Sequence, residues 1–273
     1  MREATKKIHS VSDSMVNAKL GFAMSDERVW AEGLLIFYEV FKFLEEAIDR
    51  LRPKNEYFDR FQKVLEGIDR KAAFESDLYF YYGPHWKKTC YQPRSSVSDY
   101  IKHLKTLEAR EPLRLLAYIY HLYMGLLSGG QIIKRKRDIK TKITKGATNI
   151  FGFVIPSCVL NRAFNITSST SKSGHQGNAA TDIRIEGRSI SSIKKDIVFT
   201  MNDISADLSK DERVSLIDES ILVFTWNNKV VSTIQVSWFD AFRNVATNPF
   251  VAFILLGLLG SMWYLLFLRW VEP

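Results

Sequence analysis

The chain has 273 residues, 46% of them hydrophobic, and a formal net charge of +8. This length and apolar content suit one large domain, and the charge fits nucleic acid, an anionic membrane, an acidic protein or a carboxylate-bearing ligand. The two cysteines, Cys90 and Cys158, are far apart and lack a neighbouring Cys or His at zinc-site spacing, which excludes a disulfide framework and a structural zinc site and indicates a reducing compartment.

The first part of the chain has the periodicity of amphipathic helices. A first helix is predicted over residues 2–19, where apolar side chains recur on one face and Gly21 follows. The apolar face of that helix consists of Ala4, Ile8, Val11, Met15 and Ala18, and further helices are predicted over 26–51, 57–80 and 97–108.

Residues 112–136 are apolar nearly all round, as expected of a helix buried at the centre of a domain. This segment also contains Gly125, Gly129 and Gly130. Because each glycine costs a helix interior about 1 kcal/mol relative to alanine, the group indicates a kink or a backbone that lies close against something. A bulky flat ligand would satisfy this requirement, and so would close packing of helices through small residues.

The second half of the chain begins with a basic stretch over 134–145. This stretch is either a solvated helix end or a docking surface for anionic lipid or an acidic reductase. The Ser/Thr/Gly/Asn tract at 165–182 is predicted to be a flexible surface loop. Helices follow over 190–203 and 211–234, the latter after a capping box that begins at Ser209. Strand-like alternation is scarce, so the fold class is all-α.

The two ends of the chain predict a membrane tether. Residues 250–268 form an uncharged run, and a helix of this length spans roughly 28 Å, close to the hydrocarbon thickness of a bilayer. Residues 1–7 lack the apolar stretch of a secretory signal, so we expect the main domain to stay in the cytosol. The predicted organisation is a helical domain over 1–235, a linker over 236–248 and a C-terminal transmembrane helix over 249–270.

Four sequence blocks resemble the haem oxygenase family in their order and approximate spacing. They read ATKKIHSVSD around His9, FLEEAIDR at 43–50, RKAAFESDLYFYYGPHW at 70–86 and MGLLSGGQ at 124–131. The resemblance covers residues 2–135 well and 185–228 loosely. It implies a single multi-helix haem oxygenase-like domain.

The resemblance also implies a haem site. His9 corresponds to the axial ligand of the haem iron, Arg2 and Lys6 on the same helical face would meet the propionates, and Lys194 aligns loosely with another propionate-facing lysine. Read without the family, this charged face is a solvated one. Tyr120 is a further expected haem contact, and the glycine-rich helix would pass over haem and leave room for dioxygen; its wall consists of Gly125, Gly129 and Gly130.

The chain departs from the family where polar groups are expected around the bound haem. Leu126 stands in place of an aspartate that organises the waters delivering a proton to dioxygen, and leucine neither donates nor accepts a hydrogen bond. Leu122 replaces an arginine and Phe41 a tyrosine, so the polar partners are missing together. Val198 replaces an arginine near the propionates, which weakens that clamp. We therefore expect slow turnover.

The leading hypothesis is a haem oxygenase of the endoplasmic reticulum membrane, with a C-terminal tail anchor and its catalytic domain facing the cytosol. As the resemblance implies, it would use dioxygen and electrons from an NADPH-dependent cytochrome reductase to convert haem into biliverdin, carbon monoxide and ferrous iron. No nucleic-acid partner is expected. Two alternatives remain open: a haem-binding or haem-sensing pseudoenzyme, and a tail-anchored helical adaptor without haem.

Overall fold

The computed structural model describes residues 2–23, 27–89, 91–135, 139 and 177–235, and the single residues 257, 260, 261 and 263. Regular structure in this part of the chain is helical, as predicted, apart from one isolated bridge between Ile185 and Arg188. Its elements are α1 (Arg2–Ala23), α2 (Glu27–Leu51), α3 (Glu56–Leu65), α4 (Lys71–Tyr82), α5 (Trp86–Thr89), α6 (Ser95–Arg110), η1 (Pro112–Arg114), α7 (Leu115–Gly125), η2 (Leu126–Gly130), α10 (Ile190–Asp207) and α11 (Lys210–Ser232).

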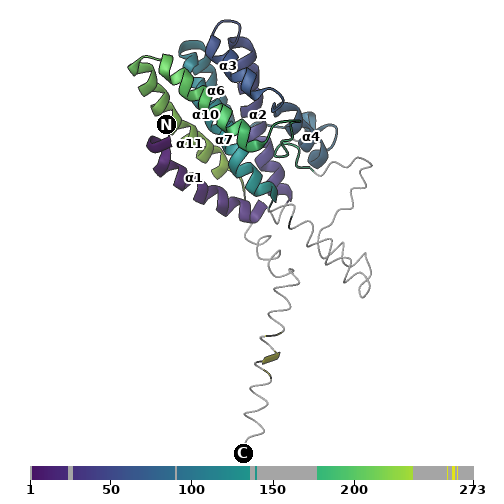
Figure 1. Ribbon diagram of the computed structural model, residues 1–273. Helices are drawn as coiled ribbons and strands as arrows, with labels where there is room; N and C mark the ends of the chain where they lie inside the picture. Colours follow the sequence, from purple (N-terminus) through teal and green to yellow (C-terminus); the bar gives the residue numbers. More distant parts are fainter. Residues whose placement is uncertain are drawn as a thin grey trace, which may run out of the picture. The chain divides into compact units, whose positions relative to one another are not determined.

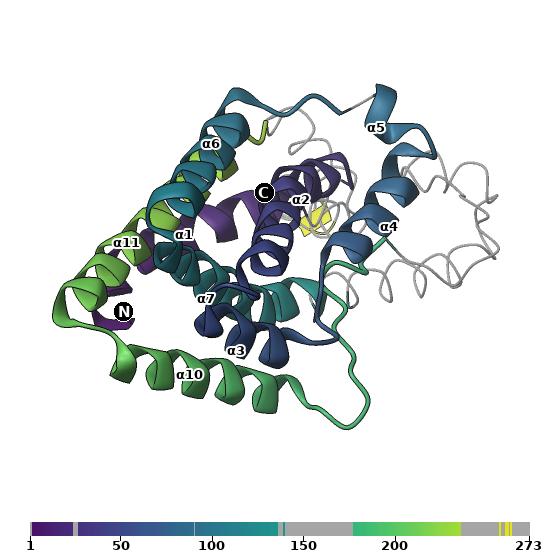
Figure 2. The same cartoon turned by 90° about the horizontal axis from the view of Figure 1, so that it is seen from above.

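Helix α2 lies at the centre of the domain and packs against α1, α3, α4, α6, α7 and α11. Figure 2 shows it between α6 and α4, with α3 and α10 side by side at one edge. Its side chains at Val40, Leu44 and Ala47 are completely buried. Helix α7 is also buried along most of its length, which confirms the central helix expected from the apolar segment that begins at residue 112.

Helix boundaries agree with the sequence pattern where a strong stop signal is present. Gly83 follows α4 with φ of 80°, and the Ser209 and Glu212 side chains form the predicted capping box of α11. The helical pattern over 57–80, however, is divided into α3 and α4, because Gly67 with φ of 78° turns the chain between them. Gly21 does not end α1, since one glycine costs a helix only about 1 kcal/mol.

Helix α1 lies alongside α11 (Figure 1) but buries only part of the face that its apolar residues predict. Val11 is 55% exposed, whereas Thr5 and Ser12 are only 3% and 8% exposed. The predicted apolar face is therefore wrong at Ala4 and Val11, which are exposed, whereas Ile8 and Met15 are half-buried. Thr5, Ile8 and Ser12 recur at helical spacing on the packed side, and the small side chains of Thr5 and Ser12 allow α1 to come close to its neighbours.

The segment that begins at residue 177 is held by polar groups of α2 and α4. The completely buried Asp77 carboxylate accepts hydrogen bonds from the backbone N–H groups of Ala179 and Ala180, both at 2.8 Å. Trp30 Nε1 and the Tyr81 hydroxyl both donate to the carbonyl oxygen of Gly177, at 3.3 and 2.9 Å. A charged acceptor makes strong hydrogen bonds, so residues 177–182 differ from the flexible loop predicted over 165–182. The rest of that tract lies outside the described residues.

The predicted membrane segment, 249–270, also lies outside the described residues, apart from Gly257, Gly260, Ser261 and Trp263, as does the predicted linker over 236–248. In the part of the chain that the structure describes, no helix has the length and apolar character needed to cross a membrane.

A matched pair of glycine substitutions tests the anchoring of residue 177. Gly177 has φ of 65°, and a Cβ atom there would lie 2.6 Å from Phe80 Cδ1 and from the Tyr81 hydroxyl oxygen, whereas Gly187 has φ of 75° and open space around it. Both substitutions to alanine strain the backbone, but only Gly177→Ala also forces two aromatic side chains apart. We expect Gly177→Ala to lower the free energy of unfolding by about 1 to 3 kcal/mol more than Gly187→Ala. Urea denaturation measures both, and equal losses would contradict this anchoring.

Candidate haem-binding site

The glycine-rich segment at the end of α7 has an unusual backbone. The α-helix ends at Gly125, and residues 126–130 continue as a π-helical stretch, η2. Such stretches are rare, and they occur frequently at functional sites. A Cβ atom placed on Gly125 or Gly129 would meet no atom within 4 Å. Close packing against another described helix therefore does not explain these two glycines, and the backbone there is open to a ligand.

Gly130 has a different environment from the other two glycines. It is buried, and a Cβ atom there would lie 3.2 Å from Leu126 Cδ1 and 3.8 Å from Thr181 Cγ2. Gln131 reinforces this contact by donating a 2.8 Å hydrogen bond to the Thr181 carbonyl oxygen. Gly130 thus serves close packing between η2 and the segment that starts at residue 177.

His9 lies on α1 with its side chain 54% exposed. Its Nδ1 atom is 2.9 Å from Asp13 Oδ2, one helical turn further on. A carboxylate at this distance holds the imidazole proton on Nδ1, which leaves the lone pair of Nε2 available to a metal. The ring of His9 also contacts Phe224 of α11, with ring centroids 5.2 Å apart.

A second histidine, His121 of α7, contacts the same phenylalanine, with ring centroids 5.1 Å apart. Its Nε2 atom is buried and has no hydrogen-bond partner among the described residues. Burial, followed by the positive charges of the amino terminus and of His9, lowers the pKa of His121 to about 4, so its ring is neutral at pH 7. Phe224 therefore brings an imidazole of α1 and one of α7 to the same place on α11.

His121 was not among the residues predicted for the haem site. The available signal was its spacing: residues 121, 125 and 129 are four apart, so they share one face of a helix. Tyr120, which the sequence did suggest, is half-buried on α7 with its ring centroid 5.0 Å from that of His121.

The three residues that replace the expected polar groups belong to an apolar region. Phe41 is buried in α2, with its ring centroid 5.4 Å from that of Tyr123 and 5.3 Å from that of Phe74. Leu122 is buried in α7 and Leu126 is half-buried at the start of η2. None of these side chains can hold an ordered water by a hydrogen bond.

The predicted cationic residues lie on different helices. Lys6 is exposed on α1, and Arg2 is the first residue of that helix, although its side chain lies outside the described part. Lys194 is half-buried on α10, which packs against α3 and α7, whereas α1 packs against α11 and α2. Separate helix pairs therefore position Lys6 and Lys194.

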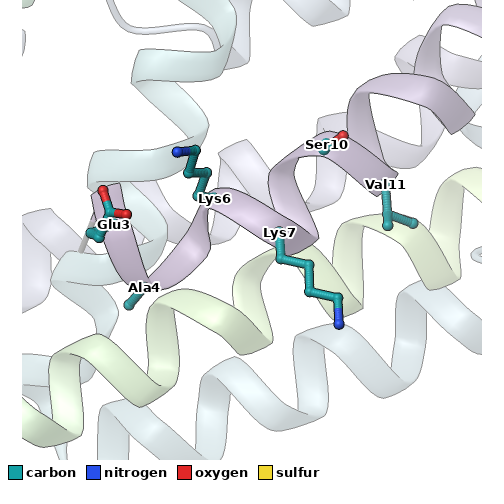
Figure 3. A pocket seen from close by; sticks show the side chains of 6 residues that line it. All are labelled: Glu3, Ala4, Lys6, Lys7, Ser10 and Val11. Atoms are coloured by element: carbon teal, nitrogen blue, oxygen red, sulfur yellow. The ribbon is translucent and has the colours of Figure 1, made fainter.

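A shallow groove runs along α1, and all of its lining residues come from that helix (Figure 3). Lys6 and Lys7 point to opposite sides of the helix in this view. A groove formed by one helix does not enclose a flat ligand, so we place the candidate site where α1 and α7 meet Phe224. The groove residues are Glu3, Ala4, Lys6, Lys7, Ser10 and Val11.

The fold and this site define an all-helical domain with an imidazole on its first helix and an open glycine backbone on a central one. The family profile described as "Heme oxygenase" matches residues 1–233. The chain belongs to the heme oxygenase family.

Individual relatives agree with this assignment. The chain is similar to heme oxygenase 1 of Rattus norvegicus, with 31% identity over 165 residues that cover 58% of this chain and 54% of the rat protein. It is also similar to a heme oxygenase of Rhodella violacea, with 32% identity over 158 residues that cover 56% of this chain and 60% of the relative. The chain thus spans little more than half the length of these curated relatives.

Solved structures share the fold. Heme oxygenase 2 from Chlamydomonas reinhardtii, crystallised without heme, is 28% identical with a TM-score of 0.68, and the match covers 87% of this chain and 96% of that one. A cyanobacterial heme oxygenase-1 from Synechocystis, in complex with heme, has a TM-score of 0.64 at 22% identity, covering 86% of this chain and 90% of that one, and supports the fold alone.

Alanine substitutions separate the two kinds of glycine. Gly125 has ordinary helical angles, φ of −62° and ψ of −45°, and open space where a Cβ would go. We expect Gly125→Ala to raise the free energy of unfolding of the ligand-free protein by up to about 1 kcal/mol. Gly130→Ala should gain less or lose stability, because the new methyl group would crowd Leu126. Thermal unfolding without haem measures both, and an equal gain would show that Gly130 is not needed for packing.

Proposed function

We propose that this protein binds haem between α1 and the α7–η2 segment and oxidatively opens it, acting as a slow haem oxygenase. The observation that carries the proposal is the open backbone over Gly125 and Gly129 in a member of the heme oxygenase family. Glycines at these helical positions reduce stability unless a bound group uses the space. A planar porphyrin fits that requirement.

The side chains on α1 also suit haem. His9 would be the axial ligand of the iron, because the contact between its Nδ1 atom and Asp13 leaves Nε2 available. Lys6, and Arg2 at the start of the same helix, supply positive charge for the propionates. When bound, haem supplies both the redox-active iron and the porphyrin ring that is opened to biliverdin, with carbon monoxide and ferrous iron released.

The protein's own residues would bind and orient the substrate but supply little proton-transfer chemistry. The backbone of Gly125 and Gly129 leaves space for dioxygen beside the porphyrin. Leu122 and Leu126 cannot order a water there, so any proton has to come through water held by backbone groups. We therefore propose slow turnover with poor selection of the ring carbon that is attacked.

The same apolar region supports a second candidate, a haem-binding protein that does not turn haem over. Phe41 packs against Tyr123 and Phe74 as an ordinary core residue and takes no part in a polar network. The two candidates share haem binding and differ in whether the bound haem is consumed.

We further propose that the domain works at the cytosolic face of the endoplasmic reticulum, tethered by residues 249–270, with dioxygen and electrons from an NADPH-dependent cytochrome reductase. The support is the uncharged run at 250–268, which is long enough for a helix that crosses a bilayer. The full chain should remain in the membrane after carbonate extraction, whereas a chain ending at residue 248 should be released. Release of both forms would contradict the tether.

Replacing His9 tests haem binding and catalysis together. Haemin added to the full chain should give a sharp Soret band, and His9→Ala should broaden or shift it because the iron loses its imidazole ligand. Added imidazole should restore the band of His9→Ala. With reductase and NADPH, the wild-type band should disappear as a bile pigment forms. His85→Ala, at an exposed histidine between α4 and α5, is the matched control.

The outcomes of this experiment separate the candidates. A wild-type band that persists without pigment, under conditions where another family member is active, favours the non-catalytic haem-binding protein. If haemin gives no band with the wild type, both haem-based functions are wrong.

A further inference from the structure

The ligand-free protein leaves one ring nitrogen of His121 without a hydrogen bond. Its Nε2 atom is buried without a hydrogen-bond partner in the described part of the chain. Leaving a buried polar atom unpaired is costly, and most such atoms in native proteins have a partner. The neighbouring rings of Tyr120 and Phe224 offer Nε2 only weak contacts with their faces. His121 Nε2 is therefore available to pair with a polar group of a ligand.

The position of His121 indicates what that partner is. It lies one helical turn before Gly125, on the face that carries the open glycine backbone. Side chains on a helix lean toward its amino end, so His121 leans away from Gly125 and from the space available to dioxygen. A ligand lying over the glycines would present its edge to His121, with its centre nearer Gly125.

The chemistry of that edge follows from the charges around it. His121 and His9 both contact Phe224, so His121 faces the helix that also carries Lys6. Burial is the main reason why the pKa of His121 is lowered and its ring is neutral. A neutral imidazole can place its single proton on Nε2 and donate it to a carboxylate. The carboxylates of haem are its two propionates, at one edge of the porphyrin.

We propose that His121 Nε2 donates a hydrogen bond to a haem propionate and so fixes the rotation of haem in its site. This inference rests on the proposed haem binding. It also accounts for a departure noted in the sequence: Val198 stands where an arginine would assist the propionate clamp, and His121 supplies a replacement donor from α7. His121 is thus a positioning residue, and it contacts neither the iron nor dioxygen.

The test compares haemin with haemin dimethyl ester, in which both propionates are uncharged esters. His121→Phe keeps an aromatic ring against Phe224 and removes the donor. We expect the Kd for haemin to rise roughly tenfold, as loss of one hydrogen bond to a charged group predicts, with the Kd for the ester nearly unchanged. The Soret maximum and the electron paramagnetic resonance spin state of the haemin complex should stay as in the wild type.

Two further variants control for shape and folding. His121→Gln retains a side-chain N–H donor and should recover most of the haemin affinity, even if His121→Phe proves unstable. His85→Phe, at an exposed histidine, should change neither Kd.

Three results would overturn the assignment. Equal losses of affinity for haemin and its ester would mean that His121 contributes only shape. A change from low-spin to high-spin iron in His121→Phe would make His121 an axial ligand. If His121→Phe and wild type bind haemin equally, while His9→Ala abolishes the normal band, haem binding stands and this inference alone is wrong; if wild type binds no haemin, both fall.

Discussion

The contact of Phe224 with two histidine rings holds the candidate site together. Helix α11 packs against both α1 and α7, and at Phe224 the ring of His9 and the ring of His121 lie 5.2 and 5.1 Å away, centroid to centroid. Apart from this contact, α1 buries little apolar surface, since Thr5 and Ser12 are buried and Val11 is exposed. The position of His9, the proposed iron ligand, thus depends on its ring contact with Phe224.

The buried tyrosines of α7, Tyr118 and Tyr123, are hydrogen-bonded, whereas His121 Nε2 on the same helix is not. The Glu219 carboxylate, 1% exposed, accepts hydrogen bonds from the Tyr118 hydroxyl at 2.6 Å and from His103 Nε2 at 2.9 Å, joining α6, α7 and α11. Glu45 of α2 accepts a 2.9 Å hydrogen bond from the Tyr123 hydroxyl. Since buried polar atoms are usually paired, the unpaired Nε2 of His121, among the described residues, supports the proposed contact with a ligand.

The sequence predicts the fold well and the packing less well. Strong local signals, such as the capping box at Ser209 and the turn at Gly83, give correct helix ends because they act through bonds within a few residues. The order of residues 177–182 was not predictable, because it depends on Asp77, about 100 residues away in sequence. The buried face of α1 was not predictable either, because the apolar periodicity of α1 is weak and its packing against α11 is a contact distant in sequence. The assignments of His9 and the glycines to a haem site stay predictions.

The glycine-rich segment shows why a motif alone does not define a mechanism. Gly130 is explained by packing against Leu126, whereas Gly125 and Gly129 face open space and need a ligand to explain them. The open positions, Gly125 and Gly129, are therefore separate from Leu122 and Leu126, where the family resemblance predicts polar groups. Leucine at 122 and 126 removes hydrogen-bonding capacity without closing the space over the glycines. Under the proposed function, affinity for a porphyrin and the rate of its oxidation can thus change independently.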